Sequence, residues 1–123
     1  MRCSATLQPM PFVLVFAGLG LLLIALALPL FLRKLPPNRW YGVRLAATFA
    51  DEAVWYEANA LSGRDLIVLG VLQVLAATLL PALLSEPVYV FLNLGLMLAG
   101  SIVFGIAAVV RANRLLAERQ TTR

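Results

Sequence analysis

The amino-acid sequence predicts an all-α integral membrane protein, a bundle of three transmembrane helices with an interfacial amphipathic helix in the loop between spans one and two. Composition is the first reason: 62% of the 123 residues are hydrophobic and 13% are charged, where a soluble domain has about 25% charged residues. Three long runs without charge are the second reason. A chain of this length fits a single domain over residues 1–123.

The first uncharged run covers residues 11–32, and a helix needs about 20 apolar residues to cross a bilayer. A cleaved signal peptide is the alternative, but this run is long for one and lacks a small-x-small cleavage site. We therefore expect a retained span. Cys3 precedes the run, which argues against a lipoprotein acceptor, and as the single cysteine it excludes an internal disulfide.

The second and third runs cover residues 66–84 and 88–110, separated by Ser85, Glu86 and Pro87. So short a break predicts a tight helical hairpin, with the proline opening the third helix, where its missing N–H costs nothing. Four polar residues within these spans are expected to form interhelical hydrogen bonds. They are Gln73, Thr78, Asn93 and Ser101, and for Asn93 a ligand near the outer surface is the alternative.

Small residues four positions apart recur in the third run, as Gly95/Ala99 and Ser101/Gly105. Such pairs let helices approach closely. They are predicted either to pack span three against span two or to join two copies of the chain, so a homodimer is one expectation.

The basic residues predict the orientation. All ten except Arg2 lie in the loop of residues 33–65 or in the tail of residues 111–123. With three spans these two regions share a side, and the positive-inside rule places them in the cytoplasm, with the N-terminus outside. Because these residues flank apolar runs, we expect them to contact the lipid bilayer and not nucleic acid.

The loop is long enough to carry structure of its own. Pro36-Pro37 ends the first helix, and Gly42 allows a tight turn. Thr48 to Asp51 has the form of a capping box, so we expect a separate interfacial helix over residues 49–62 that ends at Gly63.

Two residues depart from the amphipathic pattern of that helix. Trp55 falls on the polar face with Asn59, and either anchors the helix at headgroup level or faces and braces the segment PNRWYGVR. Glu57 falls on the apolar face, where an unpaired carboxylate is costly, so we expect an ion pair with Arg39 or Arg44.

Catalytic chemistry is not indicated. The chain has no histidine and no glycine-rich phosphate loop, and the adjacent acids Asp51 and Glu52 suit a helix N-terminus better than an acid/base pair. A metal site from these two acids and Glu57 is disfavoured because the side chains diverge around a helix. We expect a non-enzymatic protein without a cofactor or metal.

The spacing of the loop residues resembles the SdpI immunity-protein family, bacterial membrane proteins with a PN-x-x-YG-x-R motif followed by Thr, Trp, Asn and Gly. The matching residues are Asn38, Arg39, Tyr41, Gly42, Arg44, Thr48, Trp55, Asn59 and Gly63, with Pro37 before them. The sequence departs from the family at Leu45-Ala46-Ala47, and in having three spans where the named member has more.

The resemblance implies immunity to a secreted peptide toxin, signalling by drawing a soluble regulator to the membrane, or both, in the bacterial inner membrane. Arg39 and Arg44 would supply charge, Trp40, Tyr41 and Trp55 aromatic contacts, and Asn38 and Asn59 hydrogen bonds. The alternative is that these residues only seat the helices. The alternative function is a small packing subunit of a transporter or membrane enzyme complex.

Overall fold

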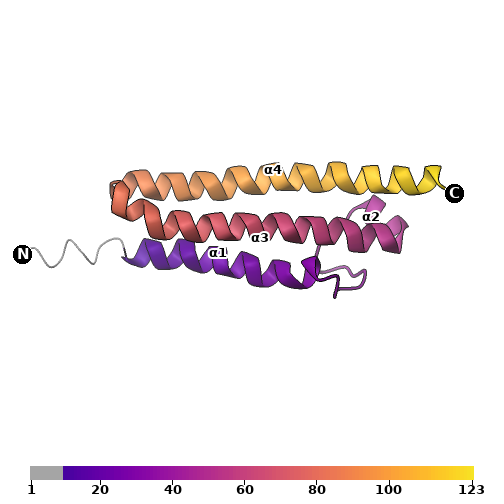
Figure 1. Ribbon diagram of the computed structural model, residues 1–123, viewed down its shortest axis with the longest axis horizontal. Coiled ribbons are helices and arrows are strands. Elements are labelled where there is room, and N and C mark those ends of the chain that lie inside the picture. Colours follow the sequence, from indigo (N-terminus) through magenta and orange to yellow (C-terminus); the bar gives the residue numbers. More distant parts are fainter. Residues whose placement is uncertain (1–9) are drawn as a thin grey trace, which may run out of the picture.

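Three long helices run side by side in the computed structural model, which describes residues 10–123 (Figure 1). The elements are α1 (Met10–Phe31), the short α2 (Ala46–Ala50), α3 (Glu52–Leu83) and α4 (Glu86–Thr121). α1, α3 and α4 are each long and apolar enough to cross a membrane. The predicted all-α architecture with three membrane-spanning helices is confirmed. The expectations for Arg2 and Cys3 lie outside the described residues.

The predicted interfacial helix over residues 49–62 is not a separate element. α3 runs without a break from Glu52 to Leu83, so the expectation that a helix ends at Gly63 was wrong. The N-terminal cap is Asp51, whose carboxylate accepts hydrogen bonds from the backbone N–H of Ala53 at 2.8 Å and Val54 at 3.3 Å. The capping box predicted at Thr48 was therefore wrong as well, because Thr48 belongs to α2.

Close backbone contact between α1 and α3 explains the glycines. A Cβ atom on Gly20 would lie 2.7 Å from the carbonyl oxygen of Gly70, and one on Gly70 would lie 2.6 Å from that of Gly20. A Cβ atom on Gly63 would lie 2.6 Å from the backbone nitrogen of Phe31 and 2.9 Å from the oxygen of Ala27. Gly63 thus marks a helix crossing, where small residues admit close packing.

The hairpin between α3 and α4 is as predicted, with Pro87 in the first turn of α4. The small-residue pairs do not pack α4 on α3, however. A Cβ atom on Gly95 or Gly105 would meet nothing within 4 Å, whereas one on Gly100 would collide with Leu69. Gly100 is the close-packed residue, and pairing of two copies through Gly95 and Gly105 stays a prediction.

One interhelical polar contact lies deep between α3 and α4. Gln73 Nε2 donates to Asn93 Oδ1 at 2.9 Å, and Asn93 Nδ2 donates to the carbonyl of Tyr89 at 2.8 Å, with both amides fully buried. The predicted hydrogen bonding of these two residues is confirmed. Thr78 instead bonds carbonyls of its own helix, and Ser101 is exposed.

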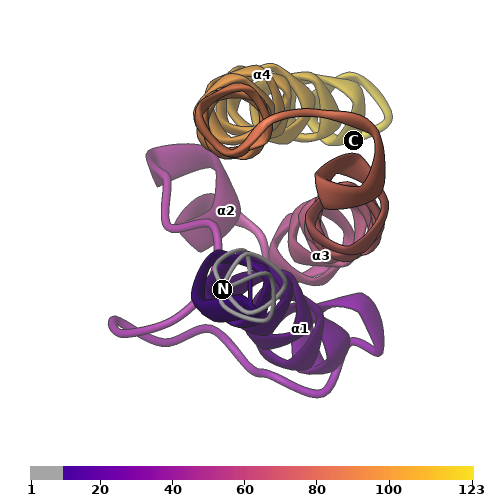
Figure 2. The same cartoon turned by 90° about the vertical axis from the view of Figure 1, so that its left-hand side faces the viewer.

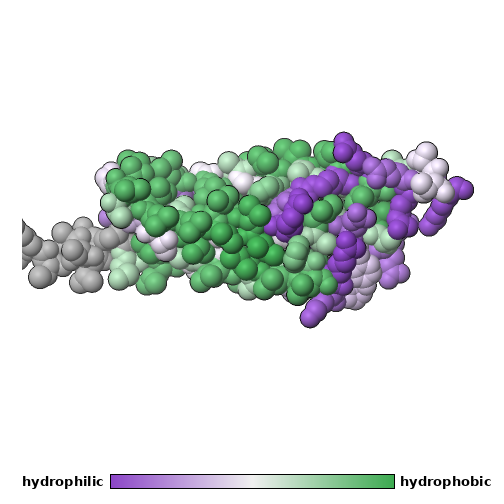
Figure 3. Space-filling view, in the orientation of Figure 1, coloured by the Kyte–Doolittle hydropathy of each residue, from purple (hydrophilic) through white to green (hydrophobic). Residues whose placement is uncertain are grey.

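The two ends of the bundle differ in polarity. Hydrophobic side chains cover the greater part of the molecule, and hydrophilic ones gather at the end that holds the loop and the C-terminus (Figure 3). At this end α2 lies beside the bundle against α3 and α4 (Figure 2). A small core of Ala47, Ala58 and Ala112, packed against leucines, joins α2, α3 and α4. The end as a whole is a folded polar cap on an apolar bundle.

Candidate functional site

The candidate site is the loop of residues 35–45, which connects α1 to α2 at the polar end. Asn38 shapes its first turn. The side-chain oxygen of Asn38 accepts hydrogen bonds from the backbone N–H of Trp40 at 2.9 Å and Tyr41 at 2.7 Å. Its amide nitrogen donates to the carbonyl of Pro36 at 2.9 Å. An asparagine side chain that accepts hydrogen bonds from the backbone two and three residues later mimics the backbone hydrogen bond of a turn.

Asn59 of α3 holds the middle of the loop. Its side-chain oxygen accepts from the backbone N–H of Val43 at 2.6 Å, and its nitrogen donates to the carbonyl of Trp55 at 2.9 Å. Gly42 makes this contact feasible. Its φ is +104°, and a Cβ atom there would lie 2.5 Å from the Asn59 oxygen. Only glycine meets both requirements without strain.

Trp55 holds the start of the loop. Its indole nitrogen donates to the carbonyl of Leu35 at 3.0 Å, and its ring lies 5.4 Å from that of Phe49. The side chain is fully buried, so it does not lie among lipid headgroups. The interfacial anchor is therefore contradicted. Asn59 bonds Val43 inside the segment PNRWYGVR, as the brace interpretation expects, whereas Trp55 bonds Leu35 just before that segment.

Thr48 and Arg44 close the loop onto α2. The Thr48 hydroxyl accepts from the backbone N–H of Leu45 at 2.9 Å and lies 2.9 Å from the carbonyls of Val43 and Leu45, to one of which it donates. The Arg44 guanidinium donates to the carbonyl of Arg39. These bonds satisfy backbone groups of an irregular segment, which therefore has a fixed conformation.

Two aromatic residues at the loop tip have different surroundings. Trp40 is 90% exposed, beside the exposed Arg39. Tyr41 is partly covered, and burial raises the pKa of its hydroxyl, which has no hydrogen-bond partner among residues 10–123. The loop thus presents one large aromatic surface on a fixed frame.

The structure brings together eight of the nine predicted site residues. Gly63 is the exception, because it lies in the α1–α3 contact. The remaining members form, brace or close the loop: Asn38, Arg39, Tyr41, Gly42, Arg44, Thr48, Trp55 and Asn59. Within residues 10–123 there is no cluster of three or more His, Cys, Asp and Glu residues that could hold a metal ion.

An ion pair below the loop was not predicted. Asp65 of α3 is buried and accepts from Arg111 of α4, while Arg64 contacts its other oxygen at 3.1 Å. The sequence holds a signal for this pair, since each residue directly adjoins the end of an uncharged run on the same predicted side. The pair fixes the register of α3 against α4.

Two further ion pairs join Asp51, the N-terminal cap of α3, to arginines at the C-terminal end of the chain. Asp51 lies 3.8 Å from Arg119 and 3.4 Å from Arg123. Burial alone would raise the pKa of Asp51, but the backbone N–H groups of Val54 and Ala53 and the charges of the two arginines together hold it below its ordinary value. The negative charge is therefore retained to lower pH than in a free aspartate.

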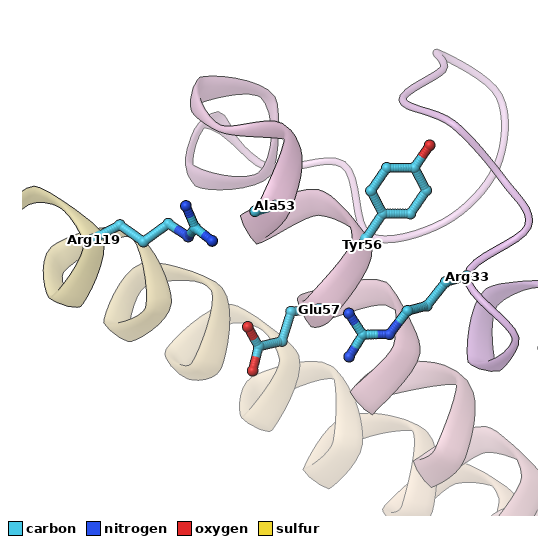
Figure 4. A pocket seen from close by; sticks show the side chains of 5 residues that line it. All are labelled: Arg33, Ala53, Tyr56, Glu57 and Arg119. Atoms are coloured by element: carbon cyan, nitrogen blue, oxygen red, sulfur yellow. The ribbon is translucent and has the colours of Figure 1, made fainter.

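Glu57 does not pair as expected. No ion pair within 4 Å joins it to Arg39, Arg44 or any other of residues 10–123, so that prediction was wrong. Glu57 instead lines a cleft between α3 and α4, with Arg33 and Arg119 on its two sides (Figure 4). The reason is the loop fold, in which the Arg44 side chain turns back to the carbonyl of Arg39.

Comparison with known proteins agrees with this geometry. The model of the SdpI/YfhL protein family matches residues 34–113, which begin just before the loop and extend through most of α4. No curated protein and no solved structure gives a significant match. The matched segment is about two thirds of the 123 residues and contains the whole candidate site, so the chain belongs to the SdpI/YfhL protein family.

Proposed function

We propose that this chain is a non-enzymatic immunity protein of the bacterial inner membrane that recognises a partner through its 35–45 loop. The partner is a secreted peptide toxin in its membrane-bound state. Instead of the toxin, or in addition to it, the same loop recruits a soluble regulatory protein to the membrane and thereby signals. Both roles place the loop and the C-terminus in the cytoplasm, as the distribution of basic residues favours.

The observation that carries the proposal is the display of Trp40. A tryptophan that is 90% exposed makes little contact with the rest of the chain, yet the loop that holds it is fixed by Asn38, Trp55 and Asn59. Large aromatic residues on rigid frames are typical anchors of binding interfaces, because little conformational entropy is lost on binding. Arg39 beside it adds a charge that suits an acidic or carboxylate-bearing partner.

The test is survival of toxin-treated cells that carry variants at equal membrane levels. Trp40→Ala is expected to abolish most protection, since loss of an anchoring aromatic residue costs about 2 kcal/mol or more of binding free energy. Phe91→Ala is the matched control. Phe91 is also an exposed aromatic residue, but it lies near the start of α4, at the end of the bundle away from the 35–45 loop. Equal protection by Trp40→Ala and wild type would refute recognition through this loop.

One observation favours the second candidate, a packing subunit of a larger membrane complex. An added Cβ atom on Gly95 or Gly105 of α4 would meet nothing within 4 Å, so each glycine leaves room for the close approach of another helix. Purification in mild detergent separates the candidates. A stoichiometric large partner that is lost in Gly95→Leu would support the subunit, a second copy of the chain would support the homodimer, and a monomer would exclude both.

A further inference from the structure

A charged cleft between α3 and α4 remains outside the loop site. It consists of two adjoining hollows of about 400 and 370 Å3, which share Glu57 and Arg119. The first is also lined by Arg33, Ala53 and Tyr56, and the second by Leu115, Glu118 and Thr122. In Figure 4, Arg33 and Arg119 lie on opposite sides of Glu57, with Arg33 directed toward Glu57 and Arg119 toward Ala53.

The two acids of this cleft, Glu57 and Glu118, have no ion-pair partner among residues 10–123, whereas Arg119 contacts Asp51. Asp51 and Asp65, the other two acids of residues 10–123 with largely covered side chains, each contact two arginines. Glu57 is half-buried and has no such contact. A carboxylate removed from water without a partner is costly, so the second hollow, which Glu57 and Glu118 line, suits an ammonium group. The first hollow, which Arg33 and Arg119 line, suits a phosphate, to which guanidinium groups donate pairs of hydrogen bonds.

The position of the cleft matches the headgroup layer of a bilayer. Arg33 follows Leu32, an exposed residue that ends the apolar surface of α1. Below Glu57, the same face of α3 carries first the exposed Arg64 and then Val68, Leu72 and Leu75, all exposed, at the spacing of residues that share one helix face. A molecule with its polar group in the cleft thus has apolar surface for acyl chains beyond Arg64.

We propose that this cleft binds the headgroup of a zwitterionic aminophospholipid. The lipid phosphate occupies the first hollow, which Arg33 and Arg119 both line, and its primary ammonium donates hydrogen bonds to Glu57 from the second hollow, where Glu118 is the other acid. Arg119 lies 3.8 Å from Asp51 and is about half exposed, so it is free to turn toward the phosphate. A quaternary ammonium has no N–H to donate and fits this site less well. The inference does not depend on the function of the 35–45 loop.

Native mass spectrometry of the full chain in detergent provides the test. The probes are short-chain phosphatidylethanolamine, phosphatidylcholine and phosphatidylglycerol, with inorganic phosphate as competitor. We expect about fivefold preference for phosphatidylethanolamine over phosphatidylcholine, because a half-exposed ion pair contributes modestly. Glu57→Gln should remove the preference, and Glu52→Gln, an exposed acid on the same helix, should retain it.

The outcomes are distinct. Equal binding of phosphatidylethanolamine and phosphatidylcholine by the wild-type chain would overturn the proposal, as would an undiminished preference in Glu57→Gln. Stronger binding of phosphatidylglycerol would overturn it by showing a general anion site, and efficient displacement by inorganic phosphate would overturn it by showing a phosphate site without lipid specificity. Arg33→Gln should weaken all three lipids together, and an unchanged affinity would remove Arg33 from the site.

Discussion

The close contact of α1 with α3 at Gly63 gives the sharpest prediction. In Gly63→Ala the new methyl group would lie 2.6 Å from the backbone nitrogen of Phe31 and 2.9 Å from the carbonyl oxygen of Ala27. Both are backbone atoms of a helix, so neither moves alone and α1 must shift as a unit. Overpacking of this kind costs about 1–3 kcal/mol, and we expect the upper part of that range.

The assay is unfolding in mixed micelles with increasing sodium dodecyl sulfate, followed by tryptophan emission. A Trp40→Phe background leaves the fully buried Trp55 as the reporter. Gly95→Ala is the matched control, because its methyl group would enter open space. The substitution also replaces glycine with a better helix former, so we expect no loss of stability. If Gly63→Ala unfolded at the same detergent fraction as the parent or a higher one, as Gly95→Ala is expected to do, the close contact at Gly63 would be contradicted.

Three further predictions concern the polar cap. Gly42→Ala should cost about 1–2 kcal/mol at its positive φ, and limited trypsin digestion should then cut the 35–45 loop faster than in the parent. Asp65→Asn leaves Arg111 largely covered and unpaired. We expect a loss of about 2 kcal/mol in the same micelle assay, below the range for fully buried pairs because water reaches part of the guanidinium; parent-like stability would contradict the pair. For Asp51, whose pKa in the folded state is lowered from 3.8, the stabilisation is present at neutral pH and is lost as the pH falls through the folded-state value. Asp51→Asn should therefore be less stable than the parent at pH 7 and equal to it at strongly acidic pH, and a constant difference would exclude this linkage.

The spans and the hairpin were predictable because lipid imposes one dominant requirement. An uncharged run of sufficient length is informative by itself, and Pro87 after a two-residue break identifies a helix start. The brace was partly predictable too. Trp55 shares the polar helix face with Asn59 and interrupts the polar pattern of that face, which is the signal of a specific contact.

The remaining features depend on where other elements lie. A glycine that ends a helix and a glycine at a helix crossing have the same local sequence, so Gly63 is interpretable only once the position of α1 is known. Thr48 and Asp51 can both cap a helix N-terminus, and the short α2, which includes Thr48, leaves Asp51 as the cap of α3. Whether Glu57 meets Arg39 or Arg44 depends on the path of the loop. No sequence periodicity predicts the conformation of an irregular loop, so the lack of this ion pair could not be foreseen.

The proposed function requires that the 35–45 loop hold Trp40 at the cytoplasmic face of the membrane. The decisive measurement is cysteine labelling of Trp40→Cys in a Cys3→Ser background with a membrane-impermeant maleimide. We expect no labelling of position 40 in intact cells and rapid labelling once the inner membrane is permeabilised. Rapid labelling in intact cells would contradict it.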